Sequence, residues 1–230
     1  MTRRTNARIA GLTFLLYIAV AFPSMVLSAK ATAGGSIAAR LLNIAQHTTE
    51  MRITILLEIL SGFCGLVLAV TLYAITRDED RDLARLGFAC RVAEGLAGVF
   101  PVTTLGLLWL ATNGGPNAPA ASSANALAAY LLKVGTWQTI SASLFFAVGS
   151  TAFAYLLMRG RMIPAPIAWA GVFGSALLVV ILPLQLAGFI TGATTQLAWI
   201  PVGVFELTLA PWLLIKGVAA PKGLRPVVGA

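Results

Sequence analysis

Four ionisable residues lie within long apolar stretches of the chain, where charged side chains are rare. They are Glu58, Arg91, Glu94 and Glu206. A charged group near the centre of a bilayer costs about 2.5 to 3.5 kcal/mol on insertion scales, so such residues face the protein interior, pair or lose their charge. Because carboxylates and a guanidinium can hold protons, cations or polar groups, these residues form a candidate ligand or ion site.

The spacing of three of these residues predicts a charge network. Arg91 and Glu94 are three residues apart, which places them on one helix face and predicts an ion pair. Glu206 is expected at a comparable depth, so the donors of one guanidinium would bridge both carboxylates if the two helices touch. Such a network would either form a binding site or only fix the register of the helices.

A second group of residues is predicted to support the site. Its members are Arg52, Lys133, Trp137, Gln138 and Gln185. Glu58 is expected to be tied by Arg52, six residues earlier, or by Lys133. The remaining three are single polar or aromatic residues, which more often link helices or anchor them at the membrane interface.

Several kinds of chemistry are excluded by residues that the chain lacks. His47 is the one histidine and lies in a loop, which excludes a haem held by paired histidines, and no spacing suits zinc. Lys133 and Lys216 lie at the ends of apolar stretches, which argues against a retinal Schiff base. No motif of a zinc protease, serine hydrolase or P-loop occurs. We therefore predict no catalytic residue, metal ligand or cofactor.

The elements that position these residues are predicted to be membrane-spanning helices. The 230 residues are 58% hydrophobic and 10% charged, which is too apolar for a soluble domain. A run of about 20 apolar residues crosses a bilayer as a helix. The fold class is thus an all-α polytopic transmembrane bundle, one domain over 1–230, with six spans near 9–27, 53–75, 86–111, 135–158, 167–190 and 197–215.

The distribution of basic residues predicts an N-in/C-in orientation. With the N-terminus inside, the outer segments hold only Lys30, Arg40, Arg52 and Lys133, and most other basic residues fall in inner segments. Cytoplasmic loops carry such an excess of Lys and Arg. The net charge of +8 is then a topology signal that also attracts anionic membrane lipids, and nucleic acid is not expected as a partner.

The first span has an alternative interpretation. Residues 1–31 begin with basic residues, continue with an apolar stretch and end near Ser-Ala-Lys-Ala, as a cleavable signal peptide would. The apolar stretch is longer than the usual signal core and contains Pro23, which favours a retained helix. In the following outer loop, residues 38–45 are expected to form a short helix on the membrane.

Small residues and prolines predict how the spans pack. Ser61, Gly65 and Ala69 recur every four residues, a spacing that lets helix backbones approach closely. Prolines such as Pro101 and Pro183 each remove a helical hydrogen bond and are expected to bend their spans.

Several ordered motifs resemble the bacterial membrane family called "domain of unknown function four-three-eight-six". They are Ala7-Arg-Ile-Ala-Gly11, Arg52 with Glu58, Arg91-Val-Ala-Glu94, Phe145-Phe146, Tyr155-Leu-Leu-Met-Arg159, Ile163-Pro-Ala-Pro, and Phe205-Glu-Leu-Thr-Leu-Ala-Pro-Trp-Leu-Leu-Ile-Lys-Gly217. The resemblance implies a compact multi-pass protein of the bacterial inner membrane and matches Arg52, Glu58, Arg91, Glu94 and Glu206 to polar positions of the family. It implies no activity. The family tends to carry a histidine or a similar polar group early in the fourth span, where this chain has residues 133–138 and no histidine.

Three functions follow from these observations as hypotheses. The first is a non-enzymatic binder or transporter of a proton, a cation or a small polar or lipid-like ligand through the Glu/Arg site. The second is an accessory or structural subunit of a larger membrane complex, or a homo-oligomer, which the small-residue faces favour. The third is an intramembrane enzyme that acts on a lipid or quinone-like substrate with a glutamate as acid or base.

Overall fold

Six helical stretches are long and apolar enough to cross a membrane in the computed structural model, which describes residues 1–113 and 118–219. Their bounds are Arg3–Ala31, Thr48–Thr76, Arg81–Thr112, Ala121–Arg159, Ala165–Leu186 and Ala193–Ile215. The predicted all-α bundle of six spans is confirmed, and the chain is a multi-pass membrane protein. Most helices extend past the ends expected from the sequence.

Two of the spans consist of two helices each. The single-helix spans are α1 (Arg3–Ala31), α3 (Thr48–Thr76), α6 (Ala121–Arg159) and α7 (Ala165–Leu186). The third span joins α4 (Arg81–Val99) to α5 (Val102–Thr112), and the sixth joins α8 (Ala193–Leu197) to α9 (Ile200–Ile215). A further helix, α2 (Ile37–Gln46), lies between the first two spans.

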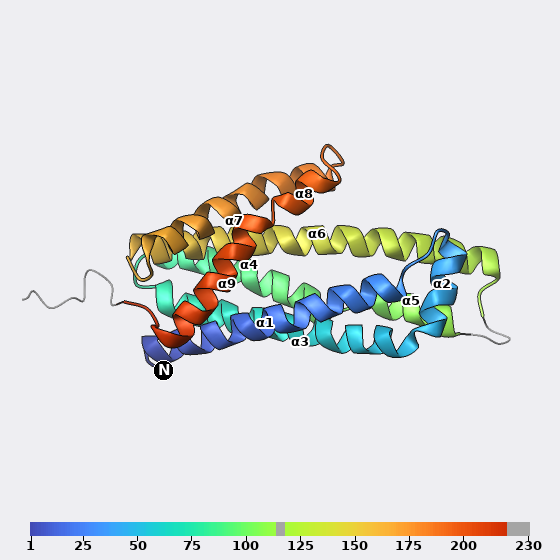
Figure 1. The fold of residues 1–230 in the computed structure, drawn as a ribbon, viewed down its shortest axis with the longest axis horizontal. Helices are drawn as coiled ribbons and strands as arrows, with labels where there is room; N and C mark the ends of the chain where they lie inside the picture. The colour runs from blue at the N-terminus through green and yellow to red at the C-terminus, as the bar shows by residue number, and fades with distance from the viewer. Residues whose placement is uncertain (114–117, 220–230) are drawn as a thin grey trace, which may run out of the picture.

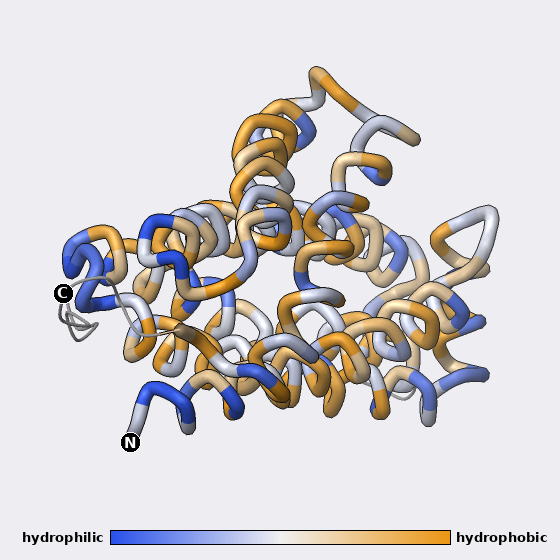
Figure 2. Tube along the Cα trace, turned by 60° about the vertical axis from the view of Figure 1, so that its left-hand side comes forward, coloured by the Kyte–Doolittle hydropathy of each residue, from blue (hydrophilic) through white to orange (hydrophobic). Residues whose placement is uncertain are grey.

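The helices are arranged so that the last one crosses the others. α1, α3, α4, α5 and α6 follow the long axis of the molecule, α7 packs on α6, and α9 crosses α1 obliquely (Figure 1). α9 packs mainly against α1 and α7, and thereby ties the two sides of the bundle together. Hydrophilic residues gather mostly at the helix ends and hydrophobic residues along the helix middles (Figure 2).

One end of the bundle, which we call the terminal end, holds the start of α1, the α3–α4 loop, the α6–α7 turn and the end of α9. Arg3 contacts Asp78 and Arg159 contacts Asp80, both at 3.3 Å between nitrogen and oxygen. The backbone N–H of Ala219 donates to the carbonyl oxygen of Met162 at 3.0 Å. The start of α1 and the end of α9 therefore lie at the same end of the bundle, as an even number of spans requires.

The opposite end, which we call the α2 end, is covered by the short helix expected between the first two spans. The side chain of Ser36 caps α2 by accepting from the N–H of Ala39 at 3.1 Å. Asn43 donates to the carbonyl oxygens of Lys30 and Ala31, where α1 ends, at 2.7 and 2.9 Å. α2 is thus fastened across the end of the bundle.

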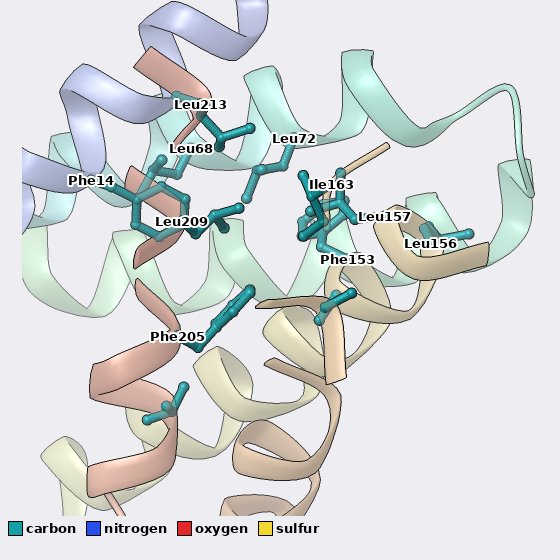
Figure 3. Packing of buried hydrophobic residues seen from close by; sticks show 14 of the residues in the cluster. Phe14, Leu68, Leu72, Phe153, Leu156, Leu157, Ile163, Phe205, Leu209 and Leu213 are labelled. Atoms are coloured by element: carbon teal, nitrogen blue, oxygen red, sulfur yellow. The ribbon is translucent and has the colours of Figure 1, made fainter. Parts of the chain in front are cut away.

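Two apolar cores hold the bundle together. The larger core lies toward the terminal end and includes Phe14, Leu68, Phe153, Phe205 and Leu209, which come from four different helices (Figure 3). The smaller core lies at the α2 end and consists of buried residues of α1, α2, α3, α5 and α6, namely Ala31, Ile44, Met51, Leu107, Leu110 and Ala128. Between the two cores, α1, α3, α5 and α6 each carry polar residues.

Glycines allow a close approach of α3 and α4, as Gly11 does for α1 and α9. A Cβ atom on Gly62 would lie 2.6 Å from the backbone nitrogen of Val99 and 2.7 Å from the carbonyl oxygen of Gly95. Gly65 and Ala69 of the predicted small-residue face are buried, and Ser61 is half-buried. The contact is therefore centred one residue further along α3 than the spacing of Ser61, Gly65 and Ala69 suggests, because Gly62 permits the closest approach.

Candidate functional site

A cavity of about 280 Å³ lies between the two apolar cores. Glu58 of α3, Glu94 of α4 and Glu206 of α9 all line it, so the fold brings together three acidic residues that lie far apart in the sequence. Tyr17 of α1 and a stretch of α6 complete the wall. Trp199, which is 36% exposed, also lines the cavity, so the cavity reaches the protein surface near the junction of α8 and α9.

The three acids reach the cavity on helices that run in different directions. Glu58 and Glu94 lie on α3 and α4, which pack along each other, whereas Glu206 lies on the oblique helix α9 (Figure 1). A Cβ atom on Gly98, four residues beyond Glu94, would lie 3.5 Å from the carbonyl oxygen of Glu58, so Glu58 lies about one helical turn closer to the α2 end than Glu94. No group of three histidine, cysteine or acidic side chains suited to a metal ion occurs in the described part of the chain.

The Arg91–Glu94 pair predicted from the sequence is present. Arg91 Nη1 lies 2.8 Å from Glu94 Oε2, and the Arg91 side chain is 1% exposed. The guanidinium carbon of Arg91 also lies 4.9 Å from the centre of the Phe146 ring, a cation–π arrangement. Glu94 additionally accepts a hydrogen bond from the hydroxyl of Tyr17 at 3.2 Å.

Glu206 makes no ion pair with Arg91, so the expectation that Arg91 bridges two carboxylates is wrong. Within residues 1–113 and 118–219, Glu206 makes no ion pair, and its buried Oε1 atom has no hydrogen-bond partner. The physical reason is the path of α9, which packs mainly on α1 and α7, away from α4. A carboxylate oxygen without a protein partner therefore faces the cavity region.

Glu58 is held by a hydroxyl group, and the expected tie to Arg52 or Lys133 is wrong. Thr104 Oγ1 donates to the two carboxylate oxygens of Glu58 at 3.0 and 3.2 Å. Six residues turn a helix by about 240°, which directs Arg52 away from the side of α3 that carries Glu58. Lys133 instead lies over the ring of Trp137, with its nitrogen 5.8 Å from the ring centre.

The third span is interrupted where it borders the cavity, although the sequence predicted one helix with a bend. The N–H of Val102 donates to the carbonyl oxygen of Phe100 at 2.8 Å, and Pro101 has φ −77° and ψ 54°, which describes an inverse γ-turn. Because proline has no N–H, the carbonyl of Ala97 loses its helical donor. The side-chain nitrogen of Gln138 donates to that carbonyl at 3.3 Å.

The break is accommodated because it faces the cavity. Ala97, Gly98, Pro101 and Gln138 all line the cavity wall. Non-helical backbone at membrane depth is tolerated where it is buried in protein or borders a cavity. Gln138, predicted as a supporting residue, is therefore part of the cavity and of the structure that permits the break.

The other supporting residues lie outside the cavity. Arg52 and Lys133 are exposed, Trp137 is 43% exposed, and Gln185 is half-buried near the end of α7. Sequence reasoning missed Tyr17, Thr104 and Trp199. The signal for Tyr17 was a hydroxyl group within an apolar span, and the signal for Thr104 was the pair of threonines that begins two residues after Pro101.

A family model described as "Domain of unknown function (DUF4386)" matches residues 9–217 of the chain. The matched range includes every residue that lines the cavity and nearly all of the six spans. No curated protein and no solved structure matches the chain.

Proposed function

Because the chain belongs to the DUF4386 family, whose description states no activity, we propose a function from the cavity itself: the protein binds a proton or a small cation there and passes it along the three carboxylates. The observation that carries this proposal is the gathering of Glu58, Glu94 and Glu206, from three helices, around one cavity. The activity is non-enzymatic binding and transport.

The charge balance of the cavity supports a cationic occupant. Arg91 compensates the charge of Glu94 at 2.8 Å. In the part of the chain that the structure describes, Glu58 is bonded to a neutral hydroxyl and Glu206 makes no ion pair. A carboxylate in a medium of low dielectric constant needs a counter-ion or a proton. The cavity thus has two acidic positions that a cation or a proton would neutralise.

The shared cavity of the acids supports movement as well as binding. The three carboxyl groups line one cavity, in which the hydroxyl group of Tyr17 donates to Glu94 and that of Thr104 donates to Glu58. A cation that leaves one acid therefore meets the next one within the same cavity. Chains of acidic and hydroxyl groups of this kind form proton and ion paths in membrane proteins.

We place the protein in the bacterial cytoplasmic membrane, with the terminal end on the cytoplasmic side. This end carries Arg3, Arg4, Arg77, Arg81 and Arg159. An excess of Arg and Lys in short cytoplasmic segments supports that orientation. In this arrangement Glu58 lies closer to the outer side than Glu94 does.

The proposal is tested by reconstituting the protein into liposomes and following proton or monovalent cation flux with entrapped indicator dyes. Glu206→Gln and Glu58→Gln should each lower the flux by about tenfold or more, because each removes a charge-assisted contact worth about 1.5 to 3 kcal/mol. Glu50→Gln is the matched control, since Glu50 also lies on α3 but pairs with Lys30 outside the cavity at 3.2 Å.

The controls separate a loss of function from a loss of folding. Each variant must elute from gel filtration at the wild-type volume. Its midpoint of thermal unfolding in detergent must lie within a few degrees of the wild-type value. Unchanged flux and unchanged binding in folded Glu58→Gln and Glu206→Gln variants would show that the cavity acids serve only to position the helices.

A further inference from the structure

The cavity combines its acids with an aromatic wall at its exposed side. Phe146 of α6 and Trp199, between α8 and α9, stack with ring centres 5.9 Å apart and planes inclined by 30°. Both residues line the cavity, as does the ring of Tyr17. From this arrangement we infer that the occupant is an organic ammonium ion with an apolar body, an inference that rests on the proposed cation-binding function.

The aromatic wall already accommodates a cation. The guanidinium of Arg91 lies over the Phe146 ring at 4.9 Å, and the other stacked ring, Trp199, borders the open part of the cavity. The face of an aromatic ring attracts a cation electrostatically, and tryptophan does so most strongly. An ammonium head can therefore lie between Trp199 and the acids, while its carbon substituents contact the rings.

The size of the cavity also favours an organic cation over a bare ion. A water molecule occupies about 30 Å³ in the liquid, so 280 Å³ corresponds to roughly nine waters, far more than a proton or a single metal ion requires. The volume approaches the lower limit of about 300 Å³ seen for small-molecule sites. The absence of a metal-binding group of side chains among the described residues points the same way.

The unpaired acid lies within the same cavity as the aromatic wall. Glu206 Oε1 is buried and has no partner among the described residues, and Trp199 precedes α9, the helix that carries Glu206. The ammonium ion would compensate the charge of Glu206. Access follows from Trp199 and Thr139, which are both exposed cavity residues.

The inference is tested with choline and its neutral isostere 3,3-dimethylbutan-1-ol, in which a carbon atom replaces the charged nitrogen of choline. Binding to the purified full chain in detergent or nanodiscs is measured by calorimetry and by the midpoint of thermal unfolding. Choline and tetramethylammonium should bind and raise the midpoint, whereas the isostere should not. Trp199→Leu should weaken choline binding roughly fivefold to thirtyfold, and Trp199→Phe should retain most of it.

Two further variants test whether a loss of choline binding is specific to the cavity, as opposed to a general effect of removing a tryptophan or of altered folding. Trp169→Leu is the matched control, because Trp169 stacks on Phe173 at 5.1 Å on α7 and does not line the cavity. It should bind choline as the wild type does. Glu206→Gln should lose choline binding.

The possible outcomes separate this inference from the proposed function. If sodium or protons bind and move but choline and tetramethylammonium do not bind, the inference is overturned and the proposed function stands. Equal binding of choline and its neutral isostere would also overturn the inference. If no cation of any kind binds or moves, both fail.

Discussion

The side-chain nitrogen of Gln138 donates to the carbonyl oxygen of Ala97 at 3.3 Å, across the interface between α6 and the end of α4. This carbonyl is the one that Pro101 leaves without a helical donor, since its acceptor position is four residues before the proline. One side chain of the fourth span thus stabilises the break in the third, and both border the cavity. The break and the cavity wall are structurally coupled.

Replacing Gln138 with Leu should destabilise the protein by about 1 kcal/mol. The substitution leaves a part-buried carbonyl oxygen without its side-chain donor. A lost donor costs about 1 to 3 kcal/mol when the group is buried in a water-soluble protein, whereas hydrogen bonds between membrane helices average closer to 0.6 kcal/mol. The measurement is equilibrium unfolding in a mixed SDS and detergent system, followed by circular dichroism.

The neighbouring residue and the proline provide the controls for Gln138. Trp137→Leu should change stability little, because Trp137 is 43% exposed and does not line the cavity. Pro101→Ala restores a backbone N–H for Ala97, so Gln138→Leu should cost much less in a Pro101→Ala background. An equal cost of Gln138→Leu in both backgrounds would show that the hydrogen bond does not support the break.

Removing Arg91 alone should be far more harmful than removing the whole Arg91–Glu94 pair. Breaking a buried pair leaves an uncompensated charge and costs about 3 to 5 kcal/mol, whereas replacing both partners is often close to neutral. We expect Arg91→Leu to lower the midpoint of thermal unfolding markedly. The double variant Arg91→Leu with Glu94→Gln should have a midpoint close to that of the wild type. Thermal unfolding in detergent measures both. A double variant as unstable as the single one would indicate that Arg91 stabilises mainly through its contact with Phe146.

The glycine contact between α3 and α4 should not tolerate a methyl group. In Gly62→Ala the new Cβ would meet backbone atoms of Val99 and Gly95 at 2.6 and 2.7 Å, which forces the helices apart and costs about 1 to 3 kcal/mol. Gly203→Ala is the matched control, since a Cβ atom at Gly203 in α9 would have no described atom of another helix within 4 Å. Unfolding in SDS should show a loss for Gly62→Ala and no loss for Gly203→Ala. A stable Gly62→Ala protein would contradict the close approach.

Hydropathy predicted the six spans, because each crosses the bilayer with an apolar run whose length is set by the membrane. It missed the interruption of the third span, since Pro101 alone is compatible with either a bend or a break. The break depends on a γ-turn and on a donor from another helix. Neither is visible in the local sequence, because Gln138 lies 37 residues beyond Pro101.

The candidate site shows the same division between local and distant contacts. The Arg91–Glu94 pair could be predicted because three residues bring two side chains onto one face of a helix. The link from Arg91 to Glu206 was predicted wrongly, because it depended on contact between α4 and α9, which pack against other helices. The partner of Glu58 was also missed, since Thr104 belongs to a helix beyond the break.

By itself, the sequence determined that this chain is a six-span membrane protein and that its few intramembrane charges are exceptional, because the cost of a charge in lipid depends only on residue type and depth. The tertiary structure decided which charges meet. Glu58, Glu94 and Glu206 share a cavity because the glycine contact of α3 with α4, the break at Pro101 and the oblique path of α9 bring their helices around it. Those relationships involve atoms that are distant along the chain, which residue spacing alone does not encode.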